Sequence, residues 1–322
     1  MSLTELMQLI TSGVVLGAMY GLIAVGYTMV YGIVQLINFA HGEIFMLGGF
    51  GALAMYAWIP PLQHMSLWLA LPIMLIGGVA ISVLAAVGAE RFAYRPLRNA
   101  PRLAPLITAI GLAIFVQQLV FLYWPTNGAD GLTLGAKQPQ VFPQLPGEAL
   151  EIGGVTLQWA DVLTLVLALV AMLVLAYFVR RTRTGRAMQA TAQDPDTAGL
   201  MGIDTDRIIV IAFVIGASLA AVAGLAHGLR YGQLTYEMGF IAGLKAFTAA
   251  VLGGIGNVYG AMLGGIVLGV VESLAAGGLG YLDAVAQFGG GAWKDVWAFV
   301  ILILVLLVRP QGLLGERTGD RA

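Results

Sequence analysis

The chain has 322 residues, of which 59% are hydrophobic and only 10% charged, with a formal net charge of −1. A soluble domain carries roughly 25% charged residues, so this composition indicates a polytopic membrane protein, with an all-α integral helix bundle as its fold class. The near-zero net charge gives no reason to expect nucleic acid as a partner, and zero cysteines exclude disulfides, iron–sulfur clusters and thiol catalysis.

About nine apolar segments are predicted to form one membrane domain that covers residues 1–322. A helix perpendicular to the membrane needs roughly 20 residues to cross the hydrocarbon core. Several segments are shorter, and any of the last three could be broken or re-entrant where protein or water satisfies the backbone. In chain order the segments run over Leu9–Val30, Phe39–Trp58, Leu67–Gly88, Leu103–Tyr123, Val162–Val179, Ile208–Leu229, Phe240–Ile255, Ala261–Ala276 and Val296–Val308.

The basic residues gather in three of the regions outside these segments. Four arginines lie within 91–102, five within 180–207 and three within 309–322, whereas the loop 124–161 has Lys137 alone against four acidic residues. The positive-inside rule therefore predicts that the three basic regions are cytoplasmic and that the loop 124–161 is outside. Nine crossings satisfy this pattern with the N-terminus outside and the C-terminus inside.

The predicted outer loop 124–161 is too short to form a domain. Within it, Glu151–Gln158 alternates around a Gly-Gly turn, a pattern that is typical of a small β-hairpin.

Glycines recur at four-residue spacing in two of the apolar segments. Small residues at this spacing let helix backbones approach closely in a membrane, so static helix packing is expected, with a sliding interface during transport as the alternative. The glycines are Gly13, Gly17 and Gly21 in the first segment and Gly260, Gly264, Gly265 and Gly269 in the eighth.

The basic loop 180–207 contains the start and stop signals of a short helix. Asp194 is a favourable N-cap, Pro195 suits the first helical position, and Gly202 suits a left-handed stop. A helix over Pro195–Met201 follows, too polar to cross the membrane but with some apolar side chains. From the residues alone it is either a connecting helix on the membrane surface or a docking element.

Five polar residues within or beside the apolar segments are candidates for a gate or pathway. A polar or ionisable group at membrane depth usually lines a protein interior, a water-filled path or a cytoplasmic mouth. We expect His41 and Glu43 near the cytoplasmic end of the second segment, where water reaches them, and we favour a structural or gating role for them over a proton relay or a metal pair. Lys245 is expected to snorkel outward, and Glu272 is its possible partner. The five candidates are Asn38, His41, Glu43, Lys245 and Glu272.

Sequence motifs for catalysis and nucleotide binding are missing from the chain. It contains no HExxH and no GxxxxGK[ST]. The glycine-rich stretch Gly253–Gly260 follows an apolar segment instead of a strand, so a tight turn between two helices is expected there. We therefore predict no catalytic residue, no cofactor and no metal, and any ATP hydrolysis must come from another subunit.

Long motifs along nearly the whole chain carry a family resemblance. The first is YGLIAVGYTMVYGIVQLINFAHGE at Tyr20–Glu43, and the later ones lie at Glu90–Arg98, Gly185–Ile203, Phe213–Gly228, Ala242–Gly269 and Arg309–Glu316. In this order they resemble the H-type membrane subunit of branched-chain amino acid ABC importers. Similar permeases serve other amino acids, amides or urea, so the resemblance specifies the permease class more closely than the solute.

The resemblance implies a multi-pass permease of the bacterial inner membrane that works among lipid with several protein partners. These are a homologous second permease, two cytoplasmic ATPase subunits and an extracytoplasmic solute-binding protein. It also implies that the loop 180–207 is the coupling element, although Pro195, Asp196 and Thr197 stand at about the place where many permeases have a Glu-Ala-Ala signature. The coupling residues carried over are Gly185, Arg186, Asp194, Pro195, Leu200, Met201 and Gly202.

Two alternative functions, from other classes of protein, compete with the ABC permease. An ion-coupled secondary transporter would work without partners and would use the buried charges to follow an ion gradient. An intramembrane enzyme would need a nucleophile–base or metal constellation, for which three scattered histidines and no cysteine offer little.

Overall fold

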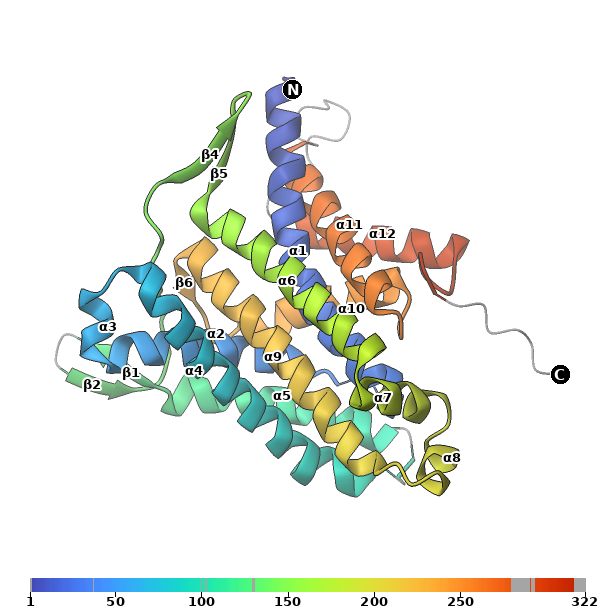
Figure 1. Cartoon of the computed structure of the whole chain (residues 1–322). Coiled ribbons are helices and arrows are strands. Elements are labelled where there is room, and N and C mark those ends of the chain that lie inside the picture. The colour runs from blue at the N-terminus through green and yellow to red at the C-terminus, as the bar shows by residue number, and fades with distance from the viewer. Residues whose placement is uncertain are drawn as a thin grey trace.

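The computed structural model describes residues 2–315 except 37, 99, 102, 129–130, 279–289 and 291–292. Side chains of 127–128 and 131–133 also fall outside the description. Four residues that entered the charge argument lie outside the described residues: Arg102, Asp130, Arg317 and Arg321. The described part is a helix bundle with three small two-stranded antiparallel sheets (Figure 1).

The first half of the bundle consists of five α-helices and a helical elbow. They are α1 (Leu3–Val34), α2 (His41–Trp58), α3 (Pro60–His64), α4 (Leu67–Gly88), a π-helical turn η1 (Ala89–Tyr94), a 3-10 turn η2 (Arg95–Leu97) and α5 (Leu103–Tyr123). The second half contains α6 (Trp159–Arg181), α7 (Arg183–Gln193), α8 (Pro195–Leu200), α9 (Thr205–Tyr231), α10 (Met238–Gly253), α11 (Val258–Gly277) and α12 (Lys294–Val308).

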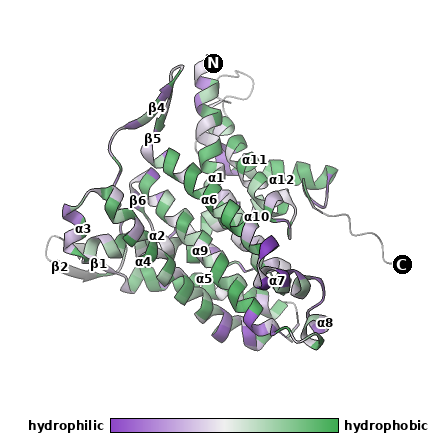
Figure 2. Ribbon diagram, viewed as in Figure 1, coloured by the Kyte–Doolittle hydropathy of each residue, from purple (hydrophilic) through white to green (hydrophobic). Residues whose placement is uncertain are grey.

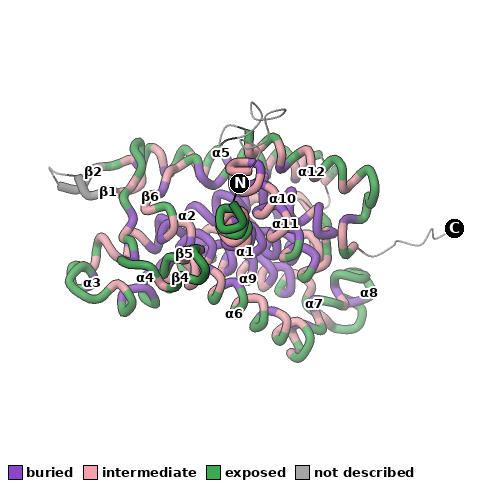
Figure 3. The backbone as a smooth tube through the Cα atoms, turned by 90° about the horizontal axis from the view of Figure 1, so that it is seen from above, coloured by how far each residue is buried: buried purple, intermediate pink, exposed green. Residues whose placement is uncertain are grey.

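Helix α1 is the central element of the bundle. It has 32 residues and begins with a capping box in which Ser2 Oγ accepts a hydrogen bond from the Glu5 N–H. Figure 3 shows it surrounded by buried segments, while α3, α5, α6, α8 and α12 lie at the periphery. A Cβ on Gly17 would lie 2.5 Å from the Ile266 Cα of α11, so the glycine spacing does mark a close helix–helix contact.

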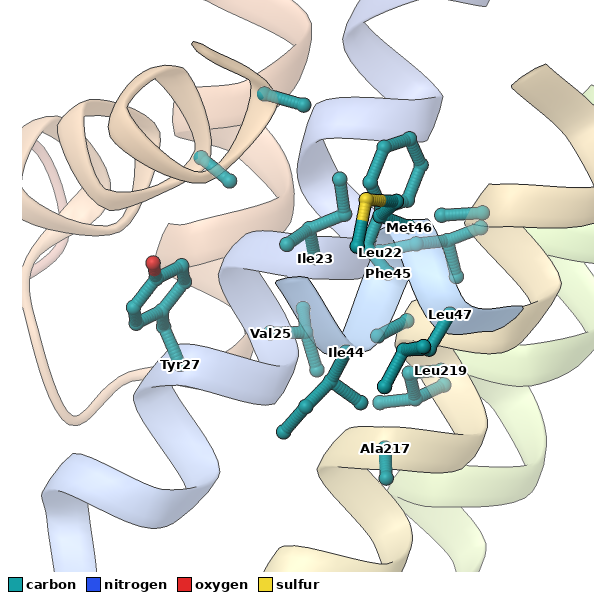
Figure 4. Packing of buried hydrophobic residues seen from close by; sticks show 14 of the residues in the cluster. Leu22, Ile23, Val25, Tyr27, Ile44, Phe45, Met46, Leu47, Ala217 and Leu219 are labelled. Carbon is teal, nitrogen blue, oxygen red and sulfur yellow. The ribbon is translucent and has the colours of Figure 1, made fainter. Parts of the chain in front are cut away.

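Helices α2, α4 and α9 form a second closely packed group beside α1. A Cβ on Gly48 would lie 2.5 Å from the Ala221 Cα of α9, and the Ser82 hydroxyl of α4 donates to the Ile44 carbonyl at 2.9 Å. Figure 4 shows side chains from α1, α2 and α9 gathered between these helices. This group holds the start of α2 deep inside the protein.

Six helices in the described part of the chain are long and apolar enough to cross a membrane. They are α1, α4 with its elbow, α5, α6, α9 and α11. Three further segments form shorter or more polar helices: α2 has 18 residues but begins with two ionisable side chains, α10 has 16 and α12 has 15. The polytopic helical fold is confirmed, whereas nine crossings and the orientation stay predictions.

The loop 124–161 contains most of the strand structure. β4 (Glu148–Ile152) and β5 (Val155–Gln158) form the predicted hairpin, and β1 (Pro125–Gly128) pairs with β2 (Gly131–Leu134). The sequence did not predict the pairing of β3 (Gln140–Val141) with β6 (Gln233–Leu234) after α9. The Phe142 N–H donates to the Gly232 carbonyl at 2.9 Å, which ties the loop to the end of α9.

Candidate functional site

The start of α2 carries a buried polar cluster made of Asn38, His41 and Glu43. These side chains are 4%, 2% and 1% exposed, so the expected contact of His41 and Glu43 with water is wrong. The reason is the glycine content of the neighbouring helices, which leaves room for the side chains inside the bundle. His41 lies between Gly26 of α1 and Gly216 of α9, where a Cβ on Gly216 would come within 3.3 Å of the His41 ring.

Glu43 and the residue before it lie against the first turns of α10. A Cβ on Gly42 would lie 2.8 Å from the Gly243 Cα, and a Cβ on Gly239 would meet the Glu43 Oε2 oxygen. The His41 ring meets the Tyr27 ring of α1 edge-on at 4.8 Å. Four helices therefore meet at the start of α2, with glycine at each contact.

Several polar atoms of this cluster have no protein hydrogen bond. Asn38 Oδ1 accepts a hydrogen bond from the Tyr94 hydroxyl at 2.5 Å. Among the described residues, Asn38 Nδ2, His41 Nε2 and Glu43 Oε2 have no partner within the protein. An unsatisfied buried polar group costs about 1–3 kcal/mol, so this crossing is destabilised relative to an apolar one.

A second buried group surrounds Lys245 of α10. Its Nζ atom lies 2.7 Å from Glu272 Oε1 of α11, 2.6 Å from Asp295 Oδ1 of α12 and 3.2 Å from the Tyr20 hydroxyl of α1. The Tyr20 hydroxyl in turn donates to Glu272 Oε2 at 3.0 Å. The possible partnership of Lys245 and Glu272 is thus confirmed, and one ionic network links four helices.

The expectation that Lys245 snorkels outward is wrong. Lys245 is 4% exposed: its Nζ donates hydrogen bonds to Glu272 Oε1 and to the Tyr20 hydroxyl and forms an ion pair with Asp295 in place. Sequence reasoning missed the third member of the network, Asp295, although an acid at the first turn of an apolar helix was a usable signal. Lys294 lies 3.9 Å from Glu272 and adds a second positive charge. The two lysines thus match the two acids, Glu272 and Asp295, and the network has no net formal charge.

The predicted short helix is present as α8, and its N-cap has the expected geometry. Asp194 Oδ1 accepts from the N–H groups of Asp196 at 3.1 Å and Thr197 at 3.0 Å, and Oδ2 accepts from the Thr197 hydroxyl at 2.5 Å. These bonds hold the pKa of Asp194 below its ordinary value, and the hydrogen bond from the Thr197 hydroxyl has the largest effect. The cap therefore keeps its full effect above about pH 3.9 and loses it as the pH falls through the lowered pKa.

The other proposed coupling residues lie around this helix. Gly202 follows it with φ +84°, the predicted left-handed stop, and Gly185 fills the elbow between α6 and α7, where a Cβ would lie 2.6 Å from the Val179 Cα. Arg186 is exposed on α7. Leu200 and Met201 are 89% and 79% exposed, so this end of α8 presents two large apolar side chains.

A charged cluster that sequence reasoning did not single out ties the helical elbow η1–η2 to the start of α9. Asp206 pairs with both Arg95 and Arg98, and Arg98 also pairs with Glu90, which is 1% exposed. An acid within a long apolar stretch, followed eight residues later by an arginine, was the available signal. This cluster fixes the elbow at the end of α4 to the first turn of α9.

The fold and these sites define a polytopic membrane protein: among the described residues, six membrane-length helices and three shorter ones surround buried ion pairs, and a capped polar helix projects from one end. Residues 9–307 match the family model described as "Branched-chain amino acid transport system / permease component". The chain belongs to this family and is its membrane permease component, not an enzyme.

Named relatives agree with this assignment. The chain is 44% identical, over 96% of each chain, to the high-affinity branched-chain amino acid transport system permease protein LivH of Salmonella typhimurium. It is 43% identical, again over 96% of each, to the corresponding protein BraD of Pseudomonas aeruginosa. It is 25% identical, over 91% of this chain and 88% of the relative, to a probable permease protein LivH of Methanocaldococcus jannaschii.

Proposed function

We propose that the chain is the transmembrane permease subunit of an ATP-binding cassette importer that moves leucine, isoleucine and valine across the bacterial inner membrane. The observation that carries this proposal is the 44% identity over 96% of the chain to a high-affinity branched-chain amino acid permease. A relationship that runs from end to end preserves the whole helix bundle, and the buried ionic network fits a transport path better than a lipid-facing surface.

The partners follow from the same proposal. A homologous second permease completes the transport path, two ATPase subunits bind on the cytoplasmic side, and a solute-binding protein delivers the amino acid outside. The exposed Leu200 and Met201 of the capped helix α8 support an ATPase docking role, because apolar side chains on a short polar helix gain free energy when a groove covers them.

The orientation belongs to this proposal as well. Nine crossings with the N-terminus outside place the loop 124–161 outside and α7 and α8 in the cytoplasm. Figure 2 shows hydrophilic residues gathered at α7 and α8 while α4, α5 and α6 are mostly hydrophobic along their length, which fits a position outside the hydrocarbon core for α7 and α8. The three shorter helices α2, α10 and α12 then complete the nine.

We assign the gate to the crossing of α2 and α10. His41 and Glu43 are buried there with unpaired polar atoms, and Asn38 extends the cluster to Tyr94. Replacing His41 with Ala or Glu43 with Gln should slow uptake while leaving the apparent affinity for solute nearly unchanged, because the separate binding protein sets that affinity. In the same proposal, Lys245 and Glu272 belong to the transport pathway.

The test of the proposed function is uptake of radiolabelled leucine into proteoliposomes that contain all the subunits, with and without ATP. ATP-dependent accumulation of leucine supports the proposal. Uptake by this chain alone, driven by a proton or sodium gradient, would show a secondary transporter instead. An ATP-driven assembly that carries urea or amides would refute only the choice of solute.

A further inference from the structure

A cavity of about 230 Å³ lies against α1, bordered by α9, α10 and the first residue of α12. It is smaller than the roughly 300–1,000 Å³ of pockets for drug-sized ligands, so it fits only a small solute. One part of its wall is polar, with Tyr20, Lys245 and Lys294 together, and the connection between α9 and α10 adds Gln233 and Thr235. The remaining wall is mainly apolar.

The apolar wall comes from three helices. Leu16, Met19 and Ile23 face the cavity from α1, Phe45 from α2 and Ile241 from α10. Met19, Ile23 and Phe45 are at most 2% exposed, so this wall is part of the packed interior. A cavity that joins a cationic end to a branched apolar wall is complementary to a carboxylate carrying an aliphatic side chain.

The two lysines at the polar end differ in what they can bind. Lys245 is 4% exposed, and its Nζ lies within 3.2 Å of Glu272, Asp295 and the Tyr20 hydroxyl, so these groups hold it away from a ligand. Lys294 lies 3.9 Å from Glu272, beyond hydrogen-bond distance, and its side chain is 43% exposed. Lys294 is therefore the cation that can receive a ligand carboxylate, while the Lys245 network holds the wall in place.

Lipid is a poor occupant of this cavity. Two neighbouring ammonium groups are disfavoured beside acyl chains, because ionisable groups of membrane proteins usually line a protein interior or a water-filled path. An aliphatic amine is also disfavoured, because Lys294 would repel it. An amino acid satisfies both walls, with its carboxylate at Lys294 and its side chain against the accessible apolar residues Leu16 and Ile241.

We propose that this cavity is a binding subsite of the permease itself for a branched aliphatic L-amino acid, with Lys294 binding the carboxylate. The proposal rests on the proposed function and names the place where the permease holds its solute. Phe45 is 0% exposed and lies behind this wall, on the same two turns of α2 as His41 and Glu43, so the cavity borders the helix that we assign to the gate. Occupancy can thereby favour one packing of α2 against α10.

Direct binding to the permease–ATPase complex in nanodiscs, without the binding protein, tests the subsite. Leucine is compared with 4-methylpentanoate, which lacks the ammonium, and with 3-methylbutylamine, which lacks the carboxylate. We expect leucine and 4-methylpentanoate to bind and 3-methylbutylamine not to bind. Equal binding of the amine, or no binding of leucine, would overturn the proposal.

The variant Lys294→Gln should weaken leucine binding at least about tenfold, since a charge-assisted hydrogen bond to the carboxylate is lost. Lys137→Gln is the matched control, because Lys137 is an exposed lysine that lines a different surface hollow. The bulky variant Ile241→Trp should lower the affinity for leucine more than that for alanine by narrowing the apolar wall. Thermal stability and basal ATPase activity, measured alongside, check that each variant folds and assembles.

The outcomes separate this proposal from the proposed function. Leucine uptake by the wild-type assembly, together with unchanged leucine affinity in Lys294→Gln and Ile241→Trp, would refute the subsite and leave the function standing. Leucine binding that depends on Lys294 in an assembly that does not transport leucine would support the subsite and refute the function.

Discussion

Removing the buried ammonium of Lys245 should destabilise the bundle more than removing any other single member of its network. In Lys245→Met the methionine fills nearly the same volume, but Glu272, whose side chain is 3% exposed, keeps a buried carboxylate without its closest cation. Breaking a buried ion pair by deleting one partner costs about 3–5 kcal/mol. Lys294, at 3.9 Å, can recover only part of this by moving toward Glu272.

The comparison with Asp295 makes this prediction specific. Asp295 also pairs with Lys245, but its side chain is 43% exposed, so water can take the place of the lost partner. Asp295→Asn should therefore cost about 1 kcal/mol or less. The double variant Lys245→Met, Glu272→Leu removes both buried charges and should recover most of the loss, leaving mainly the cost of about 1 kcal/mol for the unpaired Tyr20 hydroxyl.

The assay is reversible unfolding of the purified protein in mixed micelles by a denaturing detergent, followed by tryptophan fluorescence. The predicted order of stability is wild type, Asp295→Asn, the double variant and then Lys245→Met. If Lys245→Met were no less stable than Asp295→Asn, or if the double variant were less stable than Lys245→Met, the ionic network would not have the energetics argued from its burial.

Three other predictions follow from the packing, the coupling helix and the orientation. Gly17→Val should destabilise the protein by about 1–3 kcal/mol or more through a clash with α11, whereas Gly111→Ala, with nothing within 4 Å, should be neutral or slightly stabilising in the same unfolding assay. Leu200→Asp should leave the isolated subunit stable but lower solute-stimulated ATPase activity of the assembly; normal stimulation would exclude docking through α8. In this cysteine-free chain, Gln144→Cys should react with an impermeant reagent only from outside and Asp194→Cys only from the cytoplasm, and the reverse pattern would invert the orientation.

Local sequence signals predicted the parts of this protein that local interactions determine. Asp194, Pro195 and Gly202 act within one or two turns, so the start and stop of α8 could be read from the chain. The hairpin around Gly153 and Gly154 is local in the same sense. The long apolar helices followed from hydropathy alone, because a membrane-length helix satisfies its own backbone.

The features that the sequence could not give depend on partners far along the chain. The depth of His41 is set by glycines on α1 and α9, and no property of the residues beside it reports that contact. The pairing of β3 with β6 joins strands that four helices separate in sequence. Asp295 reaches Lys245 across 50 residues, so an acid and a base could be listed from the sequence but not matched.

The central position of α1 has a consequence for how the protein is made. Tyr20 leaves the ribosome early, yet its hydrogen-bond partner Glu272 lies 252 residues later. At 5–20 residues per second, roughly 13–50 s pass before that partner exists. During this interval α1 is in the membrane with its glycine face and its tyrosine hydroxyl turned to lipid or to temporary neighbours. Helix α1 is synthesised long before α11 and is thus among the last to reach its final packing, and early insertion of the other helices has to leave its place in the middle open.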